Sequence, residues 1–236
     1  MSGRAAGTSC AGRAWACAAL LVVLAGCGAP YFAMGPAGLS ADREAVSGAM
    51  AALLGPASWP EEAASAAPAL DAAALERAIH ERVNEVRAAY GLPRLQWSGR
   101  LLPVARAHSE DMAEHTYFDH LDRSGADATQ RAQRLHASIA DAPGGVAENL
   151  FLTQRFTSYT TTFGADGKRV YRFEWKTAGQ IAEQTVAAWM QSPAHRENVL
   201  YPRYTAQAVG VAFGGNAAVF VTQNLVSGAD GRLAAR

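Results

Sequence analysis

Apolar residues recur at helical spacing in several stretches of the chain. The stretch DAAALERAIHERVNEVRAAYG, which begins at Asp71, repeats apolar positions every three or four residues and therefore predicts a helix. His80 lies off its apolar face and is predicted to be solvated. Further helices are predicted over about residues 99–114, with Pro103 in or near the first turn, over DATQRAQRL, and over AGQIAEQTVAAWM, which Pro193 ends.

Two other stretches have the alternation that is typical of strands. Residues 155–175 alternate apolar and polar side chains around GADGK and predict a β-hairpin. Two strands are predicted at about 208–213 and 217–224, with GGN as the tight turn between them. GLPRLQW, between the first two helices, is interpreted as an extended link. This order of elements predicts an α+β fold, with an antiparallel sheet covered by helices.

The N-terminal residues differ in pattern from the rest. Arg4 and Arg13 accompany an apolar run over residues 14–26, too short for a comfortable membrane span and typical of a secretory signal. The run ends in LAGC, which resembles a bacterial lipobox, so residues 1–26 are interpreted as a lipoprotein signal peptide and Cys27 as the lipidated residue. An ordinary signal cut near Ala29 and an uncleaved anchor are the alternatives. Gly28 is not the aspartate that retains some lipoproteins at the inner membrane, which favours the outer membrane in a Gram-negative cell.

Composition adds three limits. The only cysteines are Cys10, Cys17 and Cys27, so no disulfide is expected in the folded domain. The chain has 21 basic and 21 acidic residues, and this balance offers no basic patch for nucleic acid. Residues 27–70 are rich in Ala, Gly and Pro and are interpreted as a tether, which leaves 71–227 as the domain and 228–236 as a flexible tail.

Several motifs occur in a familiar order: VNEVRAAYGLPRLQW, LLPVARAHSEDMAEHTYFDH, VAENL, and WMQSPAHRENVL followed by VGVAF. Together they resemble the CAP superfamily of cysteine-rich secretory proteins, antigen 5 proteins and pathogenesis-related proteins (the SCP-like domain). The most similar type is the disulfide-free bacterial branch. The resemblance covers about residues 76–226 and implies an α-β-α sandwich with a central cleft.

The resemblance also implies a cleft site. Members of the family bring two histidines and two glutamates together, and some bind a divalent metal there. By motif, His120 and His195 match the histidines and Glu148 matches the first acid. The second acid is missing, because Met190, Gln191 and Ser192 follow the helix tryptophan. Asn149 and Ser192 are also expected at the cleft, with Asn149 bonding backbone around Glu148.

Two interpretations of these residues stay open. His120, His195 and Glu148 are enough ligands for an open Zn²⁺ site, or a site for another divalent cation, and could equally serve as an acid–base group. Alternatively they form a structural polar cluster that binds no metal, and the lost second acid favours that interpretation. No cofactor is otherwise indicated.

Other candidate residues are weaker. Ser109, Ser124 and Ser192 all lie outside a G-x-S-x-G turn, which argues against a serine hydrolase. The spacing of His108 and His115 could place them on one helix face; they are interpreted as core or interface residues, with a second metal site as the alternative. The hairpin insertion at about 152–180 is hypothesised to overhang the cleft, with a simple surface hairpin as the alternative.

The leading functional hypothesis is a non-enzymatic binding module, tethered to the bacterial envelope through the lipid on Cys27. Its cleft would take lipid-like or cell-wall ligands. A metal-dependent hydrolase that uses His120, Glu148 and His195 is the first alternative, so enzymatic activity is left open. A protein-interaction module that uses the hairpin is the second alternative.

Overall fold

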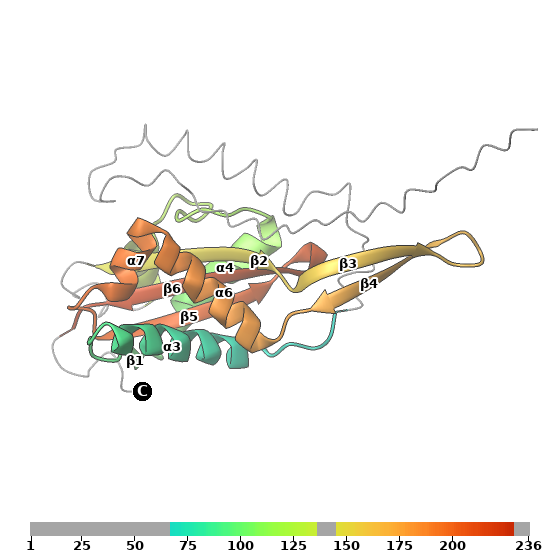
Figure 1. Ribbon diagram of the computed structural model, residues 1–236. Helices are drawn as coiled ribbons and strands as arrows, with labels where there is room; N and C mark the ends of the chain where they lie inside the picture. The colour runs from blue at the N-terminus through green and yellow to red at the C-terminus, as the bar shows by residue number, and fades with distance from the viewer. Residues whose placement is uncertain (1–66, 136–144, 229–236) are drawn as a thin grey trace, which may run out of the picture.

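Figure 1 shows the computed structural model, which describes residues 67–135 and 145–228. The predicted signal peptide, Cys27 and almost all of the tether lie outside these residues. Among the residues that are described, no helix combines the length and apolar character needed to cross a membrane.

The described helices are α3 (Ala72–Ala89), α4 (Leu102–His115), α5 (Ala128–Leu135), α6 (Ala178–Gln191) and α7 (Pro193–Leu200). The first four correspond to the predicted helices, and Pro103 lies at the start of α4, as expected. The hydrophobic pattern does not predict α7. Pro193 ends the apolar period of α6 and is also the first residue of this new helix. A proline is tolerated there because the first N–H groups of a helix have no partner within the helix.

The main sheet has four strands in the order β1 (Gln96–Trp97), β5 (Ala206–Phe213), β6 (Ala218–Val226) and β2 (Val146–Gln154). β2, β5 and β6 pair antiparallel, while β1 pairs parallel with β5 over two residues. A short 3-10 turn, η3 (Gly215–Ala217), connects β5 to β6. The sequence pattern indicates only a link at β1 and no strand at β2, since β2 is largely covered on both faces and lacks strict alternation.

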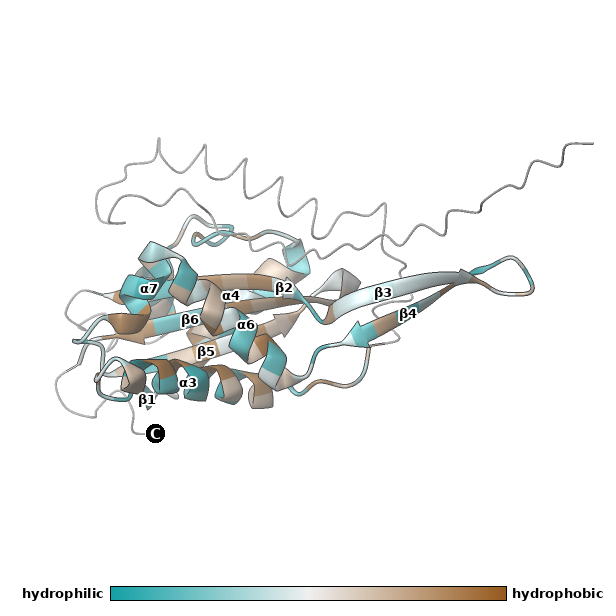
Figure 2. Ribbon diagram, in the orientation of Figure 1, coloured by the Kyte–Doolittle hydropathy of each residue, from teal (hydrophilic) through white to brown (hydrophobic). Residues whose placement is uncertain are grey.

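Helices cover both faces of this sheet, which confirms the predicted α-β-α sandwich. One core lies between the sheet and α3 and α6, and its largest fully buried side chain is Trp189. The opposite face packs against α4 and α5 through two smaller clusters, which contain Val104 and Met112. In Figure 2 the hydrophobic colour follows β2, β5 and the inner side of α3, whereas α7 is mostly hydrophilic.

α4 lies unusually close to the sheet at Gly210 of β5. A Cβ atom there would lie 2.3 Å from the backbone carbon of Ala105 and 2.3 Å from the backbone nitrogen of Arg106. Only a residue without a side chain allows this approach. The contact sets the position of α4, and with it the loop that follows α4.

His80 is buried, so the prediction that it is solvated is wrong. Its side chain and those of Asn84 and Arg87 form a polar stripe on α3 beside the apolar one, and both stripes face the protein interior. The two ring nitrogens of His80 lie 3.1 Å from Asn84 Nδ2 and 2.9 Å from Gln207 Nε2. Desolvation by burial lowers the pKa of His80. A polar residue outside the apolar stripe of a helix is therefore not always exposed.

Strands β3 (Phe156–Phe163) and β4 (Arg169–Trp175) form a separate antiparallel hairpin around residues 164–168, which confirms the predicted hairpin and turn. We call residues 155–176 the arm. Lys176 fixes its root, because Nζ donates to Thr153 Oγ1, the Gln154 carbonyl and Gln184 Oε1 at 2.7 to 3.1 Å. In Figure 1 the arm projects from the end of the body opposite α7, the helix that carries His195. The hypothesis that it overhangs the cleft is therefore wrong.

Candidate functional site

The structure brings His120, Glu148 and His195 to one place from three elements. His120 lies in the loop after α4, Glu148 on β2 and His195 on α7. His120 Nδ1 lies 3.0 Å from Glu148 Oε1. The ring centroids of His120 and His195 are 6.4 Å apart. The residues that the family resemblance implied are thus neighbours in space.

The Glu148 carboxylate is buried and already paired. Its Oε2 atom accepts hydrogen bonds from Arg131 Nη2 and from Asn224 Nδ2, the latter at 3.1 Å. The side chains of Glu148 and Arg131 are only 5% and 8% exposed, so this ion pair is shielded from water. Both carboxylate oxygens therefore have partners within the protein.

These partners keep Glu148 ionised. Burial alone would raise its pKa, but the hydrogen bond from His120 and the charge of Arg131 outweigh burial and lower the pKa to about 2. A carboxylate with this pKa holds no proton near neutral pH, and it is a weak base. Glu148 is thus poorly suited to general acid or base catalysis.

The ionised carboxylate fixes the tautomer of His120. Since Glu148 can only accept hydrogen bonds, the hydrogen of the His120 pair lies on Nδ1, and in the neutral ring the lone pair lies on Nε2. Carboxylates orient many metal-bound histidines in this way. In this arrangement Glu148 orients His120 and is not itself a ligand.

His195 is a neutral imidazole at neutral pH. Burial and the nearby His120 lower its pKa to about 4. Its ring therefore carries one N–H donor and one lone pair and can both donate to and accept from a ligand.

The backbone around His195 is held against β2. Asn149 Nδ2 donates to the His195 carbonyl at 3.1 Å, which supports the expectation that Asn149 bonds backbone here. Asn198 Nδ2 donates to Asn149 Oδ1 at 2.9 Å and to the Glu148 carbonyl at 3.3 Å. At the far end of α7, Arg87 Nη1 donates to the Val199 carbonyl at 2.8 Å. These bonds position the α7 backbone at both ends.

Three members of the cluster are missed by sequence reasoning: Arg131, Asn224 and His108. His108 is fully buried on α4, with Nε2 2.9 Å from the Asp119 carbonyl and 4.0 Å from Glu148 Oε1. Burial lowers the pKa of His108. Arg131 also donates to the His120 carbonyl at 2.8 Å, so one guanidinium holds both the carboxylate and the histidine loop.

The remaining sequence candidates do not join the cluster. Ser109 Oγ donates to the Gly210 carbonyl and shares a hydrogen bond with the Thr222 hydroxyl, and Ser124 Oγ donates to Asp122. Ser192 is buried at the junction of α6 and α7. His115 Nδ1 lies 3.0 Å from an oxygen of the Asp111 carboxylate. His108 and His115 therefore have separate surroundings and share no site.

The cluster does not present a preformed set of three protein ligands for a metal ion. Over residues 67–135 and 145–228, no group of three or more His, Cys, Asp or Glu side chains is arranged to hold a metal ion. Catalytic zinc sites ordinarily have three protein ligands. Here Arg131 and Asn224 occupy the carboxylate that would supply the third.

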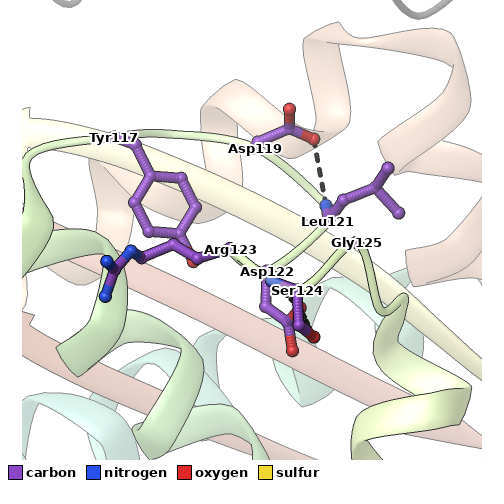
Figure 3. A pocket seen from close by; sticks show the side chains of 7 residues that line it. All are labelled: Tyr117, Asp119, Leu121, Asp122, Arg123, Ser124 and Gly125. Atoms are coloured by element: carbon purple, nitrogen blue, oxygen red, sulfur yellow. Dashed lines mark hydrogen bonds between the residues drawn. The ribbon is translucent and has the colours of Figure 1, made fainter.

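An open pocket lies along the same loop. It has a volume of about 450 Å³, and Figure 3 shows its lining residues: Tyr117, Asp119, Leu121, Asp122, Arg123, Ser124 and Gly125. Its neighbours in sequence include His120, but the cluster side chains are not part of its lining. A second pocket of about 320 Å³ lies along α6 and α7 and is lined by Met190, Gln191, Pro193, Arg196, Glu197 and Leu200.

These features define a three-layer α-β-α domain with two imidazoles beside a buried, ionised carboxylate that is paired with an arginine. The chain belongs to the CAP family: residues 80–225 match the family described as "Cysteine-rich secretory protein family".

Two relatives from Bacillus subtilis (strain 168) are similar to this chain. It is 27% identical over 136 residues to "Uncharacterized membrane protein YlbC", a match that covers 58% of this chain and 31% of the relative. It is 28% identical over 150 residues to "Uncharacterized protein YkwD", over 61% of this chain and 44% of the relative. The chain thus spans less than half the length of each.

Two solved structures are also similar. An extracellular protein containing an SCP domain from Bacillus anthracis has a TM-score of 0.49 and 22% identity, over 69% of this chain and 45% of that one. An outer surface protein from Borrelia burgdorferi has a TM-score of 0.49 and 14% identity, over 67% of this chain and 96% of that one.

Proposed function

We propose that this protein is a non-enzymatic binding module of the bacterial cell envelope, whose ligand contacts the His120–His195 side of the cleft. The observation that carries the proposal is the pairing of Glu148. A buried carboxylate held by Arg131, Asn224 and His120 stabilises the fold and orients one imidazole. It does not supply the proton transfer or the metal ligand that a hydrolase needs.

The pocket along the loop that carries His120 favours a polar ligand that extends from the cluster into this pocket. Two acids, one arginine and one serine line the larger pocket together with Tyr117. An aromatic ring among hydrogen-bonding groups suits a sugar or a wall peptide better than an acyl chain, which needs an apolar wall. We therefore place cell-wall fragments ahead of lipid-like molecules as the ligand class.

The envelope location rests on the N-terminal sequence and on one relative. LAGC at residues 24–27 resembles a lipobox, and one similar protein is named a membrane protein. Labelling with a fatty-acid analogue in a bacterial host tests the anchor. We expect incorporation into the wild-type protein and loss of incorporation in Cys27→Ser; label that persists in Cys27→Ser would contradict lipidation at this residue.

Ligand binding is tested by NMR or calorimetric titration with soluble peptidoglycan fragments and, separately, with short-chain phospholipids. We expect wall fragments to bind, and His120→Ala with His195→Ala to weaken that binding at least tenfold. His115→Ala is the matched control, because its ring lies outside the cluster. If neither ligand binds, or if the double variant binds as tightly as wild type, the cleft is not the binding site.

A further inference from the structure

The arm has one aromatic face and one polar face. Strand register places Tyr159 opposite Phe173, Thr161 opposite Tyr171 and Phe163 opposite Arg169 on one face. The other face carries three further pairs: Ser158 with Glu174, Thr160 with Arg172, and Thr162 with Val170. Alternate residues of a strand point to opposite sides, so the two faces differ in chemistry along their whole length.

The aromatic face is a continuous row of rings. Phe173 lies 5.0 Å from Trp175, 6.0 Å from Tyr159 and 6.4 Å from Tyr171, measured between ring centroids. Phe163 lies on the same face nearer the tip and is 71% exposed. Val170, near the tip on the opposite face, is 45% exposed. Large apolar side chains are thus most exposed at the point farthest from the body.

The arm is basic, although the chain as a whole is neutral. It contains five cationic residues and two acidic residues: Arg155, Lys168, Arg169, Arg172 and Lys176 against Asp166 and Glu174. Among the described residues, neither Arg169 nor Arg172 forms an ion pair with a carboxylate. Both arginines lie in β4, on opposite faces of the arm, and one of them is directly across from Phe163.

We propose that the arm docks onto the surface of a lipid bilayer that contains anionic lipids, with its aromatic face toward the membrane. Tyr, Trp and Phe rings prefer the boundary between lipid headgroups and acyl chains, where one side is apolar and the other is wet. Arginines beside them are attracted to the negative surface potential of anionic lipids. The tip of the arm places both kinds of side chain next to each other.

A bilayer fits this surface better than a folded protein does. The arm face is two strands wide and about 25 Å long, from the rise of eight residues in a strand. That area is well below the roughly 800 Å² per partner that a stable protein interface buries. Shallow insertion into a membrane has no such minimum, because apolar side chains and basic residues each add to the attraction.

The arm is also separate from the cleft. Figure 1 shows it at the end of the body away from α7, so membrane docking would leave the His120–His195 side accessible. The docking proposal does not depend on what the cleft binds, and the two can fail independently.

The experiment uses the full chain on lipid vesicles. All three native cysteines are replaced by serine, and a fluorophore is attached through Phe163→Cys on the aromatic face. Thr160→Cys, on the polar face, is the matched position. Quencher-labelled lipids then report which position touches the acyl region. Residues 14–26 give the same background attachment in every variant, so the comparison is made only at the arm.

With vesicles containing phosphatidylglycerol, we expect quenching at position 163 to be severalfold stronger than at 160. Pure phosphatidylcholine vesicles, or Arg169→Glu with Arg172→Glu, should reduce the quenching at 163 severalfold. His120→Ala with His195→Ala should leave it unchanged. Equal or absent quenching at both positions would overturn the proposal. So would a soluble anionic wall polymer that shields the dye when vesicles do not, because the partner would then be a polymer.

Discussion

Glu148 lies at the centre of the site, and its hydrogen-bond partners determine its chemical role. The family motif identifies Glu148, but only the fold shows that Arg131 and Asn224 occupy one of its oxygens. Asn224 lies 76 positions away in sequence, and no spacing pattern indicates that contact. The family motifs therefore predict that His120, Glu148 and His195 meet, but they do not predict the partners that decide whether the acid is free to react.

Replacing Glu148 tests its structural role. Glu148→Gln leaves Arg131 buried without a counter-charge, so we expect the free energy of unfolding to fall by about 3–5 kcal/mol. Urea denaturation measures this change. Glu85→Gln, which removes an exposed partner of Arg82, is the control and should change stability by less than about 1 kcal/mol. A Glu148 variant as stable as the control would show that the ion pair is not structural.

The acid side of the stability profile depends on the same residues. A histidine with a lowered pKa is charged in the unfolded chain but neutral in the fold, so stability falls as pH drops from about 6.5 toward about 4 through His195. His80 and His108 act in the same direction. Glu148, with its pKa lowered to about 2, adds a further loss below about pH 4.5.

Unfolding measured against pH checks this profile. We expect His195→Asn to flatten part of the decline between pH 6.5 and 4. A profile that is level across this window in the wild type would contradict burial of the neutral imidazoles.

At the scale of elements, the hydrophobic period predicts α3, α4, α5 and α6, and alternation predicts the β3–β4 and β5–β6 hairpins. The sequence pattern predicts neither β2 nor α7. β2 is largely covered on both faces and so lacks strict alternation, and α7 buries only Val199 and so has no apolar stripe. The burial of the polar stripe of α3 is not predicted either, because tertiary packing and not the helical period buries it. β2 carries Glu148 and α7 carries His195, so two elements that the pattern does not predict are the ones that position the site.

The close approach of α4 to β5 at Gly210 predicts that any side chain at this position destabilises the fold. Gly210→Ala places a Cβ atom against backbone atoms that have no flexible end to yield, so we expect a loss of at least about 1–3 kcal/mol in unfolding free energy. Gly215→Ala is the matched control, since no atom lies within 4 Å of its added Cβ. Thermal or urea unfolding distinguishes the two. Equal stability of both variants would show that α4 can move away from the sheet without cost.

At the scale of the whole molecule, two surfaces lie at opposite ends of one sandwich. The cleft end has imidazoles around a fixed carboxylate, and the arm end has aromatic rings among arginines. Membership of the CAP family explains the first surface, because the family motifs occur there. The arm corresponds to none of those motifs, and its amphipathic character comes from strand register alone.

We propose that the cleft cluster is a structural and ligand-binding group and not a metal-dependent catalytic centre. Calorimetric titration of metal-stripped protein with Zn²⁺ tests this most directly, alongside the His120→Ala, His195→Ala double variant. We predict no site of micromolar affinity in either protein and lower stability in the double variant. A single site of micromolar affinity or better in the wild type, lost in the double variant, would contradict the claim and would make the cleft a metal centre.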